Sequence, residues 1–160
     1  MKHLLFFLLI LTCITACKKD DSLPLEPSIE FVNIITYGND SADCIISFKD
    51  GDGDIGILEF DNTSPDDLVM KYLYRDNNGV YVAYDSSFGT PQFDTLFYTY
   101  RVPDVSPEGG TAQLEGEIMI KLRSGPIFNP LHSFVKFEIR LRDRAGNWSN
   151  IAETSIVEVP

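Results

Sequence analysis

The chain has 160 residues, with 24 acidic residues against 13 lysines and arginines, so its formal net charge at pH 7 is −11. A chain this acidic repels nucleic acid and anionic lipid headgroups, so neither is expected as a partner. The length is enough for one domain with its own hydrophobic core.

The first 16 residues have the layout of a signal peptide. A basic start at Lys2 is followed by an unbroken apolar run over residues 4–11, and then by small and polar residues. A helix that crosses a membrane needs ~20 apolar residues, and this run is shorter. We therefore expect residues 1–16 to be removed and to play no part in the fold.

The segment Ile14-Thr15-Ala16-Cys17 resembles the lipobox of bacterial lipoproteins, in which an aliphatic residue and two small residues precede a cysteine. The resemblance implies cleavage before Cys17 and attachment of diacylglycerol to its sulfur, so that lipid holds the protein at a membrane. The next segment, Lys18-Lys19-Asp20-Asp21, resembles the tag of surface-exposed lipoproteins of Bacteroidota-type bacteria. That resemblance implies display on the outer face of the outer membrane. The alternatives are an ordinary signal peptide with a chance cysteine and a tether that its charges keep in water.

Residues 17–27 are expected to form the lipidated cysteine and a tether, because Pro24 and Pro27 occur there with few core-forming residues. Residues 28–160 then form the single folded domain. Once Cys13 is discarded and Cys17 is lipidated, Cys44 has no disulfide partner within the chain. Cys44 lies in an apolar run, so we expect a small buried side chain rather than a nucleophile.

Strand patterns follow one another through the domain. Enrichment in β-branched and aromatic residues, with turn signals between the segments, predicts strands over residues 29–37, 44–48, 68–75, 80–85, 93–102, 112–122, 134–141 and 151–159. The pair Asn78-Gly79 between the third and fourth of them predicts a hairpin. No window of a dozen residues has helical periodicity, and the one candidate helix start is Ser64-Pro65-Asp66-Asp67, for a turn or two.

These seven or eight short strands predict an all-β fold, an immunoglobulin-like β-sandwich of antiparallel strands. The Cys…Trp…Cys pattern of antibody domains is absent, since Trp148 is the single tryptophan and lies near the end of the chain. A barrel or a jelly roll is the alternative architecture.

An acidic loop after the second predicted strand is the most informative stretch of the sequence. Asp50, Asp52 and Asp54 alternate with glycines, and alternate residues of an extended loop point the same way. Calcium takes six to eight oxygen ligands from carboxylates and carbonyls, so the loop predicts a divalent-cation site, with calcium as the ion. The match to an EF-hand loop fails, because Ile55 stands at the position of the required glycine and Asp61 at that of the glutamate. The alternative is a solvated acidic turn.

The run over residues 48–56, with its DGDGDIG core, resembles the signature of a family of small Bacteroidota-type surface lipoproteins. The resemblance covers the N-terminus, this loop and the turn at residues 142–150, which resembles the D-x-x-G-N-x-S turn of bacterial Ig-like modules. It implies anchoring and an Ig-like fold, and little about activity. If residues 44–48 and 134–141 are strands B and F of such a domain, the loop and the turn share one end of it. Asp143 and the side-chain oxygen of Asn147 would then complete the coordination.

The leading hypothesis is non-enzymatic: a calcium-stabilised domain, lipid-anchored at the cell surface, with a structural or interaction role. A glycan-binding protein that stacks sugars on exposed aromatic residues is the rival. The aromatic residues in question are Tyr72, Tyr74, Tyr81, Tyr84, Phe88, Phe93, Phe97, Tyr98 and Tyr100. A small hydrolase is a third hypothesis, although the common catalytic motifs are absent and the only histidine beyond the signal, His132, is expected at the surface.

Overall fold

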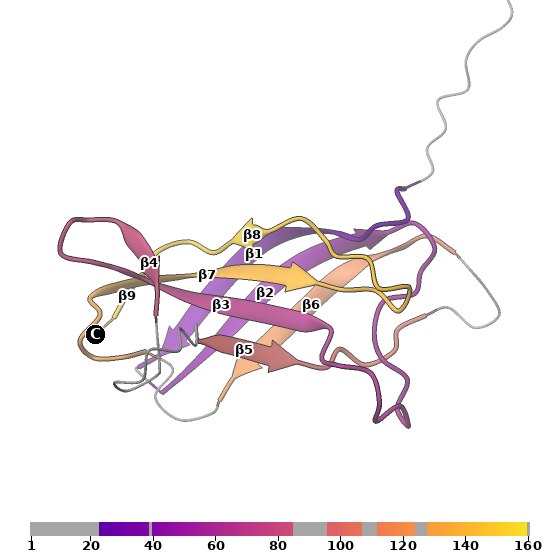
Figure 1. Cartoon of the computed structure of the whole chain (residues 1–160), viewed down its shortest axis with the longest axis horizontal. Helices are drawn as coiled ribbons and strands as arrows, with labels where there is room; N and C mark the ends of the chain where they lie inside the picture. The colour runs from indigo at the N-terminus through magenta and orange to yellow at the C-terminus, as the bar shows by residue number, and fades with distance from the viewer. Residues whose placement is uncertain (1–22, 39, 85–95, 107–111, 124–127, 160) are drawn as a thin grey trace, which may run out of the picture.

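The computed structural model describes residues 23–38, 40–84, 96–106, 112–123 and 128–159 (Figure 1). Within these residues the chain forms strands and no helix, and the strands make two antiparallel sheets. The first sheet has the order β1-β2-β6, with β1 at Ser28–Tyr37, β2 at Ser41–Asp50 and β6 at Leu114–Leu122. Every pairing in this sheet is antiparallel, so the sheet tolerates one face in water and one in the core.

The second sheet has the order β4-β3-β7-β8, and β5 and β9 pair with β3 and β7 respectively. Its strands are β3 (Leu68–Arg75), β4 (Tyr81–Ala83), β5 (Phe97–Tyr100), β7 (Phe134–Leu141), β8 (Ala152–Glu153) and β9 (Val157–Glu158). In Figure 1 this sheet lies as one layer in front of β1, β2 and β6, which form the other.

The core lies between the two layers and follows from strict alternation along the strands. In β2 the inward residues from Ala42 to Phe48 are buried and alternate with partly exposed ones, and β7 has the same pattern from Val135 to Leu141. Cys44 belongs to the inward row of β2 and is fully buried, as the sequence predicted. Phe137 of β7 is also fully buried, and removing such a ring costs about 3–5 kcal/mol. The two inward rows therefore hold the sheets together as a β-sandwich.

The prediction of an all-β sandwich of antiparallel strands is confirmed, and its finer Ig-like assignment stays a prediction. The hairpin at Asn78-Gly79 is also present: the Asp76 carboxylate accepts hydrogen bonds from the N–H groups of Asn78 and Val80, and Gly79 has a φ of 81°. The C-terminal strand predicted over residues 151–159 is two short strands, β8 and β9. Within the described residues, no helix has the length and hydropathy needed to cross a membrane.

The predicted helix start at Ser64 was wrong. Instead of capping a helix, Ser64 donates its backbone N–H and its hydroxyl to the Asp61 carboxylate, which fixes a turn. Asp67 then lies at the entrance to β3, where its buried carboxylate accepts the Val102 N–H at 2.8 Å. The pairing of β3 with its neighbours thus begins where the helix would have continued, and tertiary pairing outweighs the local capping signal.

Candidate metal centre

Asp50 is the last residue of β2 and continues the buried row of that strand. Its side chain is fully buried, at a position that Ala42, Cys44, Ile46 and Phe48 predict by alternation to be apolar. One carboxylate oxygen, Oδ2, accepts a hydrogen bond from the Asp54 N–H at 2.9 Å. The other, Oδ1, is buried without a hydrogen-bond partner among the described residues. A buried ionised oxygen without a partner is costly unless a positive charge compensates it.

The glycines of the acidic loop are required by close packing of other backbone segments against it. A Cβ on Gly51 would overlap the carbonyl oxygens of Leu23 and Pro24, so the start of the described chain passes directly over the loop. Gly53 has a φ of 69°, and a Cβ there would overlap the carbonyl of Ala112. Only glycine fits both the conformation and the space at this position.

The C-terminal turn is built around Asp143, which is buried. Its carboxylate accepts the backbone N–H of Asn147 at 2.7 Å and the side-chain amide of the same residue at 2.8 Å. The Gly146 N–H closes the turn on the Asp143 carbonyl at 3.2 Å. Asn147 therefore holds the Asp143 carboxylate in a fixed orientation, and it does so as a hydrogen-bond donor.

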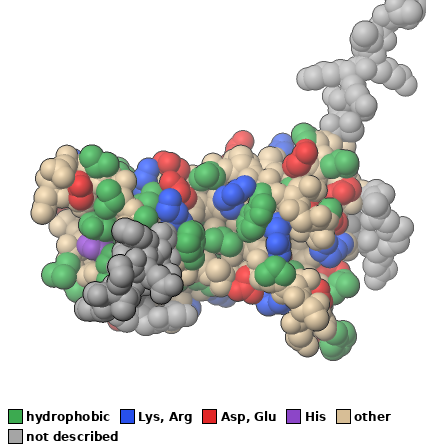
Figure 2. All heavy atoms as spheres, viewed as in Figure 1, with side chains coloured by type: hydrophobic (Ala, Val, Ile, Leu, Met, Phe, Trp, Pro, Cys, Tyr) green, Lys and Arg blue, Asp and Glu red, His purple; other side chains and the backbone are tan. Residues whose placement is uncertain are grey.

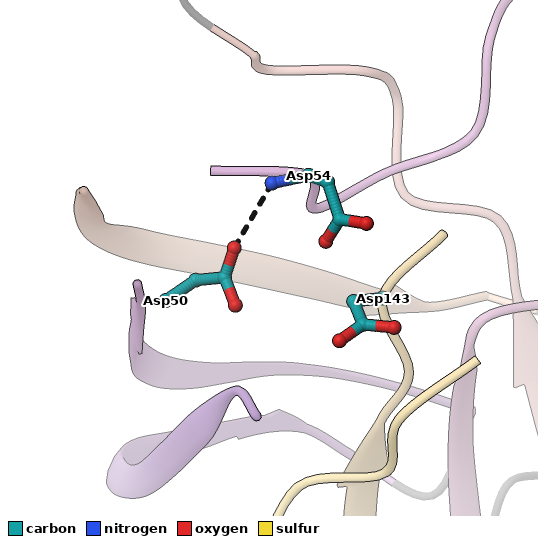
Figure 3. A group of neighbouring side chains, drawn as sticks. All are labelled: Asp50, Asp54 and Asp143. Carbon is teal, nitrogen blue, oxygen red and sulfur yellow. Dashed lines mark hydrogen bonds between the residues drawn. The ribbon is translucent and has the colours of Figure 1, made fainter. Parts of the chain in front are cut away.

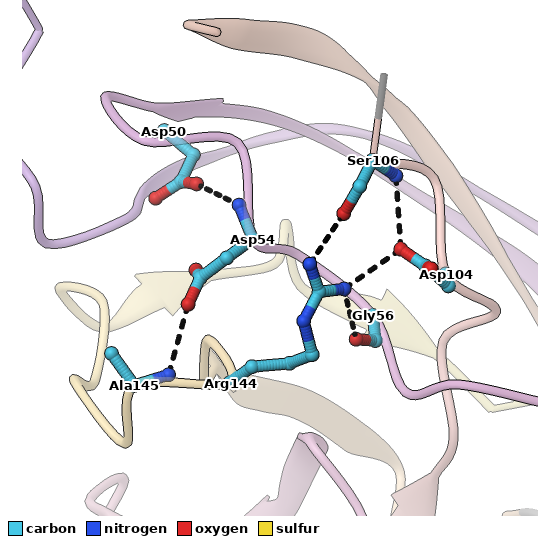
Figure 4. Close-up of polar contacts among 7 residues, drawn as sticks. All are labelled: Asp50, Asp54, Gly56, Asp104, Ser106, Arg144 and Ala145. Carbon is cyan, nitrogen blue, oxygen red and sulfur yellow. Dashed lines mark hydrogen bonds and ion pairs between the residues drawn. The ribbon is translucent and has the colours of Figure 1, made fainter. Parts of the chain in front are cut away.

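Hydrogen bonds join the loop to the turn at one end of the sandwich. The Asp54 carboxylate accepts the Ala145 N–H at 2.9 Å, and the Asp54 carbonyl accepts the Arg144 N–H at 3.2 Å. The Arg144 guanidinium then donates to the Gly56 carbonyl at 3.0 Å and to the Asp104 carboxylate at 2.7 Å (Figure 4). Segments from three parts of the sequence are thus held around Asp54.

Three carboxylates converge where the loop meets the turn. Asp50, Asp54 and Asp143 each offer an oxygen, and these three oxygens lie within 4.8 Å of one another (Figure 3). Two oxygens on opposite sides of a calcium ion are about 5 Å apart, because each Ca–O distance is about 2.3–2.6 Å. The spacing of the cluster therefore fits three ligands of one cation.

The pKa values of Asp50 and Asp54 are raised, because these carboxyl groups are buried close to other acids. Burial, and after it the charges of Asp52 and Asp54, raises the pKa of Asp50 to about 6. The pKa of Asp54 is also raised, first by burial and then by the charge of Asp143. Arg144 opposes this shift, as the weakest of the contributions to Asp54. The cluster thus favours a bound cation or a bound proton over the empty, fully ionised state.

The residues predicted from the sequence have different places in this site. Asp50, Asp54 and Asp143 come together, whereas Asp52 lies outside the group of three, although its Oδ1 is buried and has no hydrogen-bond partner among the described residues. Asn147 was predicted to contribute its side-chain oxygen, but it turns its amide nitrogen toward Asp143 and orients that carboxylate. The predicted lipidation residue, Cys17, lies outside the described residues.

Sequence reasoning missed Arg144, which ties the loop, the turn and Asp104 together. It also missed Asp67, whose Oδ2 is buried without a described partner and whose pKa burial raises. Asp67 lines a cavity of about 320 Å³ that Asp143 also lines. No local sequence signal marked Arg144, because its partners Gly56 and Asp104 lie 88 and 40 positions away along the chain.

The aromatic residues considered for sugar stacking lie mostly against the core. Among those that the structure describes, Phe97 is exposed and the others are buried or half-buried, while Phe88 and Phe93 fall outside the described residues. The expected surface position of His132 was wrong: the residue is 8% exposed, and its ring stacks on Tyr74 at 3.9 Å between centroids. Its Nδ1 is 3.2 Å from the Tyr72 hydroxyl, so the imidazole forms part of an aromatic cluster.

A scan against protein-family models finds no matching family, and searches of the curated proteins and of the solved structures find no match either.

Proposed function

We propose that this chain is a lipid-anchored cell-surface protein whose Ig-like β-sandwich binds one divalent cation, calcium, in a structural or interaction role. The signal-peptide layout and the lipobox-like segment ending at Cys17 support the anchor, and the lysine-then-acidic segment supports display at the outer membrane. The strand orders β1-β2-β6 and β4-β3-β7-β8 support the Ig-like assignment, since they correspond to orders A-B-E and C′-C-F-G.

One observation carries the cation proposal: three carboxylate oxygens lie within 4.8 Å, and two of the residues, Asp50 and Asp54, have an Oδ1 that is buried without a described partner. Acidic groups at an exposed turn are common without an ion, because water solvates them. Buried oxygens have lost that solvation, so the solvated-turn alternative does not account for Asp50.

The choice of calcium rests on ligand type and spacing. Carboxylate oxygens are hard ligands, which suit calcium and magnesium better than the softer transition metals. Magnesium requires oxygens at about 2.0–2.1 Å in a near-ideal octahedron, whereas calcium accepts six to eight oxygens at about 2.3–2.6 Å in a flexible geometry. The oxygens of Asp50, Asp54 and Asp143, which lie within 4.8 Å of one another, suit the ion with the less demanding geometry. By joining the loop after β2 to the turn after β7, the ion would stiffen this end of the sandwich.

The test is calorimetric titration of the metal-stripped domain, starting at Ser22, with calcium and then with magnesium. We expect saturable calcium binding in the wild type and none in the double variant Asp54→Asn/Asp143→Asn. Glu59→Gln is the matched control, because it removes a charge from an exposed residue outside the cluster and should leave binding unchanged. Absence of calcium binding by the wild type would refute the proposal, and tighter binding of magnesium would refute the choice of ion.

A further inference from the structure

A fixed turn at the acidic-loop end of the sandwich displays two large apolar side chains. The Asp61 N–H donates to the Leu58 carbonyl at 3.0 Å, which closes a turn around Glu59 and Phe60. Phe60 is 87% exposed and Leu58 is 55% exposed. Single exposed apolar residues are common, but Phe60 lies at the tip of an ordered turn and does not pack in the core.

Hydrogen bonds from Arg101 and within the turn fix its conformation. The Arg101 guanidinium donates to the carbonyl of Ser64 at 2.8 Å and to the carbonyl of Asp61. The Asp61 carboxylate accepts hydrogen bonds from Thr63 and Ser64, which lowers its pKa, so the acid stays ionised and the turn stays closed. Phe60 is thus presented outward on a preorganised support and would lose little conformational freedom on binding.

The turn lies at the end of the molecule where the described chain begins. Leu23 and Pro24 pass directly over Gly51 of the acidic loop, and in Figure 1 residues 23–27 and the loop between β2 and β3 lie at the same end of the sandwich. In Figure 2, hydrophobic side chains lie at the projecting tip at the lower right, where Figure 1 has that loop. The start of the described chain and the apolar tip therefore lie at the same end of the domain.

The length of chain before Leu23 sets how far this end can stand from a lipid attached to Cys17. Six residue steps separate Cys17 from Leu23, and a fully extended chain covers at most about 20 Å over that length. The other end of the sandwich lies a strand length further away, about 30 Å for strands of eight to ten residues. The tether thus keeps this end of the domain within reach of the bilayer.

We propose that Leu58 and Phe60 dock into the surface of the bilayer that carries the lipid on Cys17; this rests on the lipid anchor of the proposed function. The bilayer is the occupant because the short tether keeps it close to the tip at high effective concentration, which makes even weak insertion of two side chains sufficient. The net charge of −11 disfavours attraction to anionic headgroups, so the docking depends on the two apolar side chains rather than on charge. Docking would fix the orientation of the acidic cluster relative to the membrane.

The experiment uses the full-length mature lipoprotein, reconstituted into phosphatidylcholine vesicles with plain or brominated acyl chains. Trp148→Phe provides a background without tryptophan, since Trp148 is the only one in the chain. In that background, Phe60→Trp places a probe at the tip and Leu131→Trp places one at the opposite end, before β7. The two sites are matched, because Phe60 is 87% exposed and Leu131 is 86% exposed. Both variants should fold, since neither side chain packs in the core.

We expect the Phe60→Trp probe to shift its emission to the blue on reconstitution and to lose emission in brominated vesicles, while the Leu131→Trp probe does neither. Flotation of the same vesicles, with a Cys17→Ser chain as control, reports the anchor separately. A chain that floats through Cys17 but leaves the Phe60→Trp probe unquenched would overturn the docking alone. A chain that floats no better than Cys17→Ser would overturn the anchor, and the docking with it.

Discussion

Replacing Asp50 with asparagine separates the cost of a buried charge from the benefit of a bound cation. Asp50 is fully buried, and burial followed by the charges of Asp52 and Asp54 raises its pKa from 3.8 to about 6. A difference of about two pKa units corresponds to about 3 kcal/mol. Because the folded state has the higher pKa, the metal-free domain has this stability below pH 3.8 and loses it as the pH rises through about 6.

At pH 7 the metal-free Asp50→Asn variant is therefore expected to be more stable than the metal-free wild type by at most about 3 kcal/mol. For a domain of this size that is a rise of about 10 °C in Tm. The asparagine oxygen can still accept the Asp54 N–H, and its amide nitrogen can donate to a neighbouring carboxylate. With calcium at 100 times its Kd, the wild type gains about 2.7 kcal/mol, whereas the variant gains little or nothing.

The assay is thermal unfolding followed by circular dichroism from pH 4 to pH 8, first with chelator and then with calcium. The difference in Tm between the two metal-free proteins should be small at pH 4, grow as the pH rises to about 6, and level off above that. Glu59→Gln, which alters an exposed residue at the same end, should follow the wild type throughout. The reasoning would be refuted by a metal-free variant that is less stable than the wild type at pH 7, or by equal calcium stabilisation of both.

Two further predictions concern backbone fit and the aromatic cluster. Gly53→Ala places a Cβ against the Ala112 carbonyl at a φ of 69°. We therefore expect the free energy of unfolding, measured in urea, to fall by about 1–3 kcal/mol. A change within experimental error would contradict the packing argument. Burial lowers the pKa of His132 below 6.5, so on acidification the unfolded chain takes up the proton first and stability is lost below pH 6.5. His132→Phe keeps the stacking on Tyr74 and should lack this loss between pH 7.5 and pH 5.5; equal losses in both proteins would contradict the assignment.

The predicted strands differ in how well their bounds agree with the structure. Both β3 at Leu68–Arg75 and β7 at Phe134–Leu141 have the predicted bounds, and in β7 the alternation is visible residue by residue. In contrast, β2 covers Ser41–Asp50, whereas the prediction covered only residues 44–48. The C-terminal strand was predicted as one element, yet Thr154 interrupts it between β8 and β9. Its hydroxyl accepts the Phe137 N–H at 2.9 Å, so a side chain takes over a backbone hydrogen bond of the ladder. Periodicity in a sequence cannot reveal such a replacement.

The candidate site was predicted in outline, and its details depend on backbone geometry. The prediction assumed an extended loop in which Asp50, Asp52 and Asp54 point the same way. The positive φ of Gly53 breaks that alternation, and Asp52 is not among the three that converge. Asp143 was reached only through the Ig-like expectation that the loop and the turn share an end. Arg144 has no local sequence pattern, since its role depends on contacts with residues about 40 and 90 positions away.

Backbone packing explains why the acidic loop has glycines, but it does not explain why the loop has aspartates. Gly51, Gly53 and Gly56 each face a backbone carbonyl that a Cβ would overlap, so packing alone accounts for them. Packing does not account for Asp50, because its inward position in β2 would hold an apolar residue at no cost in buried charge. A fully buried acid beside a second acid persists only where something offsets the charge. Calcium is the compensating charge that we propose, and the titration and the Asp50→Asn comparison test it together.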